Sequence, residues 1–403
     1  MSQLSFLCVS TYFKGEAFLR ACKSLGNTVY LLTVEKLADS PWPFDAIDEV
    51  FYLLSEANSS ENLDKMVLGM AHLMRSKKID RVVALDDFDV EKAALLRETF
   101  RIPGMGQTTA RYFRDKLAMR LRASAAGIRC PAFSSLFHDQ SITDFLRAAP
   151  GPWLIKPRSE ASTTGIRKVH SLEEAWAVIH GLGESRHQYL IEQFRPGRVF
   201  HVDALSVERK TVFSRVSQYL ATPMEVAHGG GIFRTAVLPF DDPETATLRA
   251  MNDAVLDAFG MHYSASHSEY IHCQEDGQYY FLETSSRVGG AHIAEMVEAS
   301  SGVNLWREWA RLETAVALRL PYLAPADQRQ YAGLIVSLAR QQWPDLSGFS
   351  DNEIEWRLHK EYHVGLIVAS PDRGRVLDLL DQYMHRIYDE FHASAPVPAK
   401  PTH

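Results

Sequence analysis

The sequence lacks the features that mark several classes of protein. Its longer apolar runs, such as Leu4–Val9 and Val29–Val34, are far shorter than the roughly 20 residues that a membrane-spanning helix needs. Met1–Ser10 lacks the basic and apolar regions of a signal peptide. The four cysteines form no CxxC pair, which disfavours disulfides and a structural zinc site. We therefore expect a cytoplasmic protein with no membrane partner.

An excess of basic residues is also missing. The chain has 43 Lys and Arg against 50 Asp and Glu, for a net charge of -7. Binding to duplex nucleic acid needs a concentrated basic face, so no nucleic-acid partner is expected. With 403 residues, 46% of them hydrophobic, the chain exceeds the size at which one core stops growing. Two or three domains are expected.

The first part of the chain alternates strand-like and helix-like patterns. Strands are predicted at Leu4–Ser10, Thr28–Thr33, Glu49–Leu53 and Arg81–Leu85, and helices at Gly15–Leu25, Asn62–Ser76 and Val90–Phe100. This βαβ alternation predicts a parallel sheet in a Rossmann-like domain over residues 1–107. No G-x-G-x-x-G follows the first strand, so the dinucleotide-binding fingerprint is absent there.

The rest of the chain predicts a mixed α/β architecture. A helical stretch over about Thr108–Ala126 precedes a strand-rich region from Trp153 to Glu283. Further elements are helices over His292–Arg319, interrupted near Gly302, strands at Ala332–Ser337 and Val364–Ala369, and a helix at Arg373–Phe391. We expect a second domain over 108–320 with a lid at about 130–195, a small C-terminal subdomain over 321–392, and a mobile tail over 393–403.

Two carboxylates flank a tight polar turn in the stretch Glu269–Glu283. Adjacent hairpin strands can present Glu269 and Glu283 to one site. Two such carboxylates repel each other unless a cation lies between them, and hard oxygen ligands suit Mg²⁺ bound to nucleotide phosphates. Solvated carboxylates are the commoner outcome for a hairpin, so the neighbouring residues decide.

The residues after Glu283 favour the metal interpretation. Arg287 follows four positions later, with Gly289 and Gly290 behind it. A cation there can stabilise charge on a phosphoryl group or a tetrahedral adduct. The run resembles the Glu-x-Asn-x-Arg ending of the ATP-grasp superfamily, with Ser285 where Asn is usual. The resemblance implies ATP as a bound nucleotide, Mg²⁺ or Mn²⁺ held by Glu269, Glu283 and Ser285, and a catalytic role for Arg287.

Two lysines and a polar loop strengthen the resemblance. Lys116 opens the second domain and Lys156 ends a strand, and in the family such lysines bind the nucleotide phosphates. Ser159–Gly165 resembles the flexible loop that closes over the phosphates. The ATP-binding residues implied by that loop are Ser162, Thr163, Thr164 and Gly165.

Further residues occupy places that relatives use for adenine and for the acceptor substrate. Glu192 and Phe194 lie where the family's hinge strand contacts the adenine edge. His228 and Arg234, together with Gly289 and Gly290, are the expected substrate-binding residues. An arginine in that place can pair with a substrate carboxylate.

Histidines crowd the same region without completing a zinc site. His262, His267, His272 and His292 have no thiolate pair near them in the sequence. His201 is interpreted as a packing residue or as a residue that supports the ligands. Asp203 fits the family's Val-Asp pattern and is expected to tie loops together rather than to bind a ligand.

The resemblance covers essentially the whole chain and points to one branch. The segment from His359 resembles the C-terminal strand of the biotin carboxylase and L-amino-acid ligase branch. Biotin carboxylases follow the arginine with Val-Glu-His, whereas this chain has Val288–His292 with two glycines and an alanine, which disfavours bicarbonate chemistry.

The resemblance therefore implies a ligase that joins a small carboxylate to an amine, both drawn from amino acids, through an acyl phosphate. A homodimer is common among such relatives. Two alternatives stay open at this stage: a regulatory protein that binds ATP without turnover, and a carboxylase that activates bicarbonate.

Overall fold

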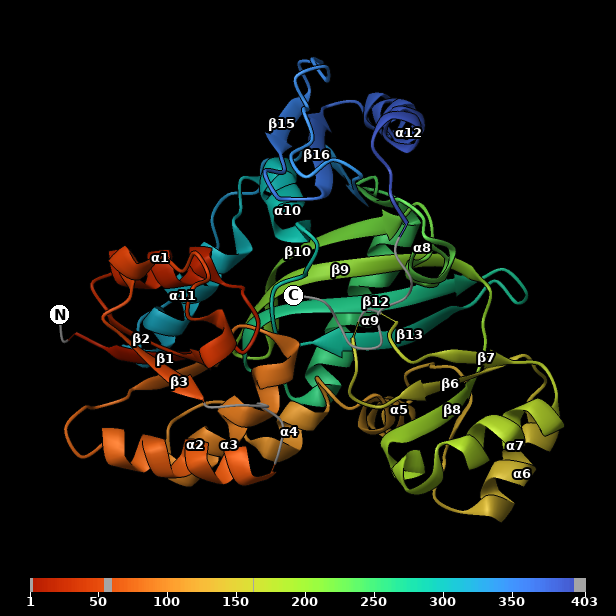
Figure 1. Ribbon diagram of the computed structural model, residues 1–403, viewed down its shortest axis with the longest axis horizontal. Coiled ribbons are helices and arrows are strands. Elements are labelled where there is room, and N and C mark those ends of the chain that lie inside the picture. The colour runs from red at the N-terminus through yellow and green to blue at the C-terminus, as the bar shows by residue number, and fades with distance from the viewer. Residues whose placement is uncertain (1–2, 54–59, 162, 395–403) are drawn as a thin grey trace.

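The computed structural model describes residues 3–53, 60–161 and 163–394 (Figure 1). In this part of the chain the strands form three sheets, and the predicted α/β class with a Rossmann-like N-terminal sheet is confirmed. The candidate residue Ser162 and the predicted tail from residue 395 onward lie outside the described residues. The domain limits stay a prediction.

The N-terminal sheet is parallel, with strand order β3-β2-β1-β4. Its elements are β1 Ser5–Val9, α1 Glu16–Ser24, β2 Thr28–Val34, β3 Glu49–Leu53, α2 Ser60–Leu73, β4 Arg81–Ala84 and α3 Val90–Phe100. All four residues of β4 are buried, as expected for a strand with both faces covered. The short helix η3, Asp87–Asp89, follows the carboxyl end of β4, the edge of a parallel sheet at which ligands usually bind.

The central sheet has the order β13-β12-β9-β10-β11-β14-β16-β15 and is antiparallel throughout. Its strands are β9 Gly197–Val207, β10 Lys210–Tyr219, β11 Phe233–Val237, β12 Tyr263–Cys273, β13 Tyr279–Ser285, β14 Tyr331–Leu338, β15 Ile354–Arg357 and β16 His363–Ser370. Residues 321–392 therefore extend this sheet, since β14 pairs with β11.

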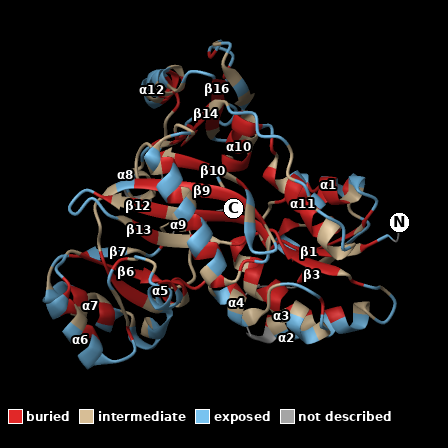
Figure 2. Ribbon diagram, turned by 180° about the vertical axis from the view of Figure 1, so that it is seen from behind, coloured by how far each residue is buried: buried red, intermediate tan, exposed pale blue. Residues whose placement is uncertain are grey.

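Helices pack against the central sheet and connect its strands. They are α8 Pro223–Gly229, α9 Pro243–Phe259, α10 Ile293–Ser301, α11 Leu305–Ala317 and α12 Arg373–Glu390. Gly302, in the left-handed conformation with φ 72°, ends α10, which confirms the predicted interruption. Figure 2 shows buried strands at the centre and outer helices whose faces alternate between buried and exposed. No helix in the described ranges is long and apolar enough to cross a membrane.

A third sheet lies apart from the other two, at the lower right of Figure 1. It has the order β5-β8-β6-β7 and its own hydrophobic core. Its elements are β5 Phe133–Ser135, α6 Asp139–Ala148, β6 Trp153–Pro157, β7 Arg167–Val169, α7 Leu172–Gly181 and β8 Tyr189–Gln193. We call residues 133–193 the lid.

The stretch predicted to be helical over about Thr108–Ala126 forms two helices, α4 Gln107–Arg111 and α5 Lys116–Ala125. The side chain of Asp115 caps α5 by accepting the backbone N–H groups of Leu117 and Ala118. A new helix therefore starts at Lys116. That start directs the lysine toward the junction between the lid and the central sheet.

Candidate active site

A cavity of about 420 Å³ lies between the lid and the central sheet. Residues from both sheets line it, including Leu154, Lys156, Glu192, Ile271, Leu282 and Glu283. One part of the lining is aliphatic and the other holds charged groups. An apolar slot beside convergent charges suits a ligand with a flat ring at one end and anionic groups at the other.

Glu269 and Glu283 face each other directly across the β12–β13 pair, as the hairpin pattern predicted, and both line the cavity. Glu269 accepts a hydrogen bond from the hydroxyl of Tyr219 at 2.8 Å. Glu283 Oε2 lies 2.9 Å from Lys116 Nζ. Burial alone would raise the pKa of Glu283, but Lys116 and Lys156 outweigh burial and hold that pKa below its ordinary value. Glu283 is therefore a carboxylate at neutral pH, the form that binds a hard metal ion.

Lys156 is buried and forms an ion pair with Glu192 Oε1 across β6 and β8. The same carboxylate is held on its other side by Arg120, whose Nη2 lies 2.9 Å from Glu192 Oε2. Burial lowers the pKa of Lys156 to about 8, even though Glu192 acts in the opposite direction. Sequence reasoning missed Arg120, which lies in a helix with no recognisable motif.

Lys116 connects the two walls of the cavity. Besides its contact with Glu283, its ammonium donates to the backbone oxygen of Glu160 at 2.7 Å. Glu160 belongs to the loop Ser159–Gly165, so one ammonium group contacts both the central sheet and this loop. An ammonium group in this position could compensate the negative charge of phosphate groups bound in the cavity.

The loop itself offers hydroxyl groups to the cavity. Thr163 and Thr164 line the cavity, and each has a buried Oγ1 without a hydrogen-bond partner among the described residues. Thr163 and Gly165 adopt positive φ values of 57° and 73°. Buried hydroxyls without partners are costly, and a phosphate ligand would satisfy them.

Glu192 and Phe194, the expected adenine-binding residues, both line the cavity. The backbone N–H of Phe194 donates to Pro152 O at 2.9 Å, so this residue offers its ring rather than its N–H group to a ligand. Lys168 Nζ lies over that ring, 3.7 Å from its centre, and also lines the cavity. Lys168 was another residue that the sequence did not single out.

Arg287 lies beyond Glu283 and pairs with a residue of the N-terminal domain. Its Nε donates to Asp87 Oδ2 at 2.9 Å, and Nη2 donates to the same oxygen. Burial alone would lower the pKa of Arg287, but Asp87 outweighs it and raises that pKa. Asp87 follows the end of β4, and the acidic run Asp86–Asp89 at the carboxyl end of a parallel strand was the signal that could have found it.

The expected acceptor residues fall in different places. Arg234 lies on β11 next to Thr235, so the two side chains point to opposite faces of the sheet. Arg234 Nη1 lies 3.5 Å from Asp381 of α12, away from the cavity lining. His228 lies in α8, whose first residues line the cavity, and the structure does not describe its side chain.

Ser285 and the glycines after Arg287 lie beside a buried histidine cluster. Ser285 pairs with His267 across β12 and β13. A Cβ added to Gly289 would lie 2.7 Å from Asp203 Oδ1 and 3.0 Å from His267 Nδ1. Gly289 is therefore required for this close approach. Gly290 has no such neighbour within 4 Å among the described residues.

Known proteins with a similar sequence or a similar structure include L-amino acid ligases. No known protein-family profile matches the chain. An L-arginine-specific L-amino acid ligase from Bacillus subtilis is 25% identical over 296 residues, which is 72% of this chain and 70% of that protein.

Two solved structures share the fold at low sequence identity. The L-amino acid ligase from Bacillus licheniformis has a TM-score of 0.74 and 16% identity, with 97% of this chain and 98% of that one covered. The biotin carboxylase domain of a 2-oxoglutarate carboxylase from Hydrogenobacter thermophilus, solved with magnesium ADP and bicarbonate, has a TM-score of 0.71 and 16% identity. That match covers 98% of this chain and 91% of the other.

Proposed function

We propose that this chain is a carboxylate–amine ligase of the ATP-grasp superfamily, an ATP-dependent enzyme that forms an amide or peptide bond. The acid is activated as an acyl phosphate, and ADP and phosphate are released. One observation carries the proposal. Glu269 and Glu283 lie opposite each other on neighbouring strands and line the same cavity as Lys116 and Lys156.

The donor set fits a magnesium ion. Glu269 and Glu283 supply hard carboxylate oxygens, which Mg²⁺ prefers, and Ser285 is the further candidate ligand two residues beyond Glu283. Mn²⁺ takes the same ligands. The ion held by these residues would offset the negative charge of the ATP phosphates.

The remaining residues have distinct roles in binding and positioning. Glu192 and Phe194 form the adenine end of the cavity, and Lys116 and Lys156 bind the phosphates. Ser162, Thr163, Thr164 and Gly165 form the loop over the phosphates. A closed loop excludes water, which would otherwise hydrolyse an acyl phosphate.

The chemistry has two balanced steps. A carboxylate oxygen of the acid attacks the γ-phosphorus of ATP, the bond between that phosphorus and the β–γ bridging oxygen breaks, and ADP leaves. The nitrogen of the amine then attacks the carbonyl carbon, phosphate leaves with the bonding electrons, and the nitrogen gives up a proton. Arg287 stabilises the negative charge of the tetrahedral intermediate.

Amino acids are the proposed substrates for both the acid and the amine. The relative from Bacillus subtilis is specific for L-arginine by its name, and the structural neighbour from Bacillus licheniformis is also an L-amino acid ligase. Arg234, His228, Gly289 and Gly290 are the candidate residues around the acceptor. A homodimer is the proposed assembly.

The test is phosphate release from magnesium ATP in the presence of pooled amino acids and small carboxylic acids, followed by mass spectrometry. Phosphate release together with a product of the mass of an amide is the expected result, and the active pool identifies both substrates. Phosphate release that depends on bicarbonate alone would point to carboxylation instead. ATP binding with no phosphate release in any pool would overturn the ligase proposal and favour a regulatory protein that binds ATP without turnover.

A further inference from the structure

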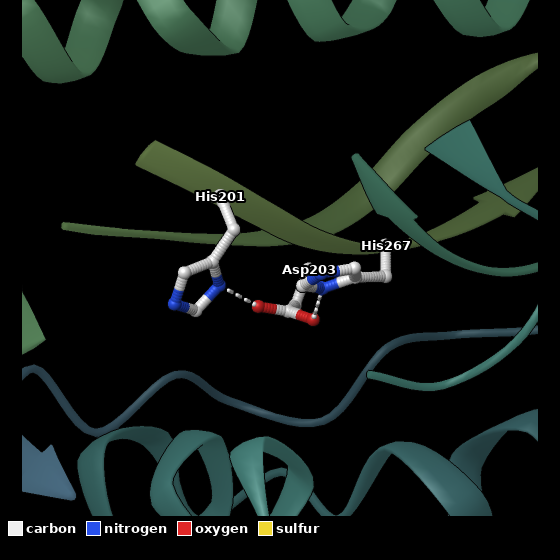
Figure 3. A group of neighbouring side chains, drawn as sticks. All are labelled: His201, Asp203 and His267. Atoms are coloured by element: carbon white, nitrogen blue, oxygen red, sulfur yellow. Dashed lines mark hydrogen bonds and ion pairs between the residues drawn. The ribbon is translucent and has the colours of Figure 1, made fainter. Parts of the chain in front are cut away.

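Three neighbouring strands bring a line of polar side chains together behind Glu269. In the register of the sheet, Asp203 of β9 faces His267 of β12, and His201 faces Glu269. Tyr219 ends β10, two residues beyond Ser217, which pairs with His201. Figure 3 shows Asp203 between the two histidines, with one of its oxygens directed at each.

The hydrogen bonds of this line run without a break from the core to the cavity. Thr235 Oγ1 lies 3.0 Å from Gln218 O and 2.7 Å from His201 Nε2, within hydrogen-bond distance of both. His201 Nδ1 lies 2.6 Å from Asp203 Oδ2, and Asp203 Oδ1 lies 2.8 Å from His267 Nδ1. Both oxygens of Asp203 are thus bound, which fixes its side chain and the ring of His267. We call Thr235, His201, Asp203, His267 and Tyr219 the Asp203 network.

The cavity end of the network is Glu269. His267 Nε2 lies 3.4 Å from the hydroxyl oxygen of Tyr219 and 3.6 Å from Glu269 Oε1. The Tyr219 hydroxyl donates to that same oxygen at 2.8 Å. The tyrosine ring is held in turn by His201, at 4.7 Å between ring centres. Both neighbours of Glu269 Oε1 therefore belong to the network.

The histidine and aspartate atoms lie close enough together to suggest a metal site, but their geometry is that of a hydrogen-bonded chain. Each ligand atom of His201 and His267 is bonded to a different oxygen of Asp203. A metal ion with nitrogen ligands at about 2.0–2.1 Å would have to replace both hydrogen bonds. The cluster is also fully enclosed, with His201 and Asp203 at 0% exposure, so no open position is left for a substrate.

We propose that the Asp203 network positions Glu269 as a ligand for the divalent cation that accompanies ATP, an inference that rests on the proposed function. Residues that form hydrogen bonds with a metal-binding side chain fix its orientation before the ion binds. Their loss typically lowers metal affinity about 10- to 100-fold. Tyr219 and His267 are positioning residues in this scheme. They act through Glu269 and touch neither nucleotide nor acid.

The experiment uses the full-length protein and Mn²⁺ as a spectroscopic probe. Free Mn²⁺ is measured by electron paramagnetic resonance during titration in the presence of ADP, which reports binding without turnover. Tyr219→Phe removes the hydroxyl that holds Glu269 and should weaken Mn²⁺ binding about 10-fold or more.

Tyr270→Phe is the matched control. Tyr270 is the neighbour of Glu269 on β12, is fully buried, and donates to Asn252 Oδ1 at 3.1 Å. This variant also removes one tyrosine hydroxyl from the central sheet, but on the face opposite to Glu269. Mn²⁺ affinity should stay at the wild-type value in this variant.

A second variant changes another residue of the network, so that the test does not depend on the folding of one variant. His267→Gln places a side-chain amide near Asp203 and removes the imidazole beside Tyr219 and Glu269. This variant should weaken Mn²⁺ binding in the same way. Binding of ADP in the presence of EDTA should be unchanged in both variants, because Glu269 and not the adenine end is disturbed.

The outcomes separate the two proposals. If the wild-type protein binds neither ADP nor Mn²⁺ with ADP, the proposed function fails. If the wild type binds both, and Tyr219→Phe and His267→Gln bind Mn²⁺ as tightly as Tyr270→Phe does, the positioning role is refuted while the ligase proposal stands. A loss of ADP binding in EDTA that equals the loss of Mn²⁺ affinity would also refute it, because the effect would then be structural.

Discussion

Arg287 and Asp87 lie 200 positions apart in the sequence, yet two N–H groups of the arginine donate to a single carboxylate oxygen of the aspartate. The pair joins the end of β13 to the loop that follows β4. Arg287, two residues beyond the end of β13, is therefore held by the N-terminal domain. The N-terminal domain thus contacts the arginine that is the candidate catalytic residue.

Asp87→Asn should lower kcat about 100-fold while changing the KM for ATP little, because the charge on Arg287 loses its fixed partner. Breaking a buried ion pair by removing one partner costs about 3–5 kcal/mol of stability, so the thermal midpoint should also fall. Steady-state phosphate release and thermal unfolding measure the two effects.

Asp86→Asn is the control, since it makes the same chemical change one residue earlier. Asp86 pairs with Lys14 within the N-terminal domain and does not contact Arg287 through any described hydrogen bond. It should lose stability and keep its kcat. Equal kcat values for the two variants would contradict a positioning role for Asp87.

Glu283→Gln should reduce ADP formation by about 100-fold or more, because it replaces a charged metal ligand by a neutral amide. The side chain keeps its size, so the fold should be retained. Coupled-enzyme detection of ADP is the measurement. Glu275→Gln, at the exposed hairpin turn, is the control and should leave the rate unchanged. A near-normal rate in Glu283→Gln would remove this residue from the metal site.

The lowered pKa of Lys156 predicts that ATP binding depends on pH. Its pKa in the free protein is about 8, so above that pH the side chain is mostly neutral. Phosphates favour the ammonium form, so binding must then take up a proton, and ATP affinity should fall by up to about tenfold per pH unit above 8. Below that pH the side chain is already charged and the affinity should level off.

Calorimetry of ATP binding at about pH 9, in two buffers with different ionisation enthalpies, measures the proton uptake directly. Lys156→Met should abolish the uptake and weaken ATP binding more than binding of the acid. Lys210→Met, at an exposed strand end, should keep the wild-type uptake. Proton uptake that persists in Lys156→Met would assign the titration to another group.

Gly289→Ala should destabilise the protein, because the new methyl group would press on Asp203 and His267. Forcing extra volume into a packed site costs about 1–3 kcal/mol. Chemical denaturation gives the free energy of unfolding. Gly290→Ala makes the same change one residue later, in open space, and should leave that free energy within about 0.5 kcal/mol of the wild type.

The sequence predicted those features that depend on local pattern. The strand Glu49–Leu53 and the helix Val90–Phe100 have their predicted limits, because turn residues and apolar spacing define them. The pairing of Glu269 with Glu283 followed from the hairpin between them. These features involve residues that are close in the sequence.

Features set by distant contacts could not be predicted in this way. Asp115, which caps the start of α5, is held by Arg158, 43 residues later, whose Nε donates to its carboxylate at 2.9 Å. Arg120 meets Glu192 only through the packing of α5 against the lid. The place of Arg234 against α12 depends on which face of β11 it occupies, which no local pattern around His228–Arg234 reveals.

The charges of the cavity are already paired before any ligand arrives. Glu283 is matched by Lys116, and Glu192 by Lys156 and Arg120. If the proposed function holds, nucleotide entry would be an ion exchange: the phosphates would take over Lys116 and Lys156, and Glu283, having lost Lys116, would need a cation in return. ATP without a metal would satisfy only the lysines and leave carboxylates facing its own negative charge. The proposed site would thus favour the metal–nucleotide complex over either component, and each component should raise the affinity for the other by the same factor.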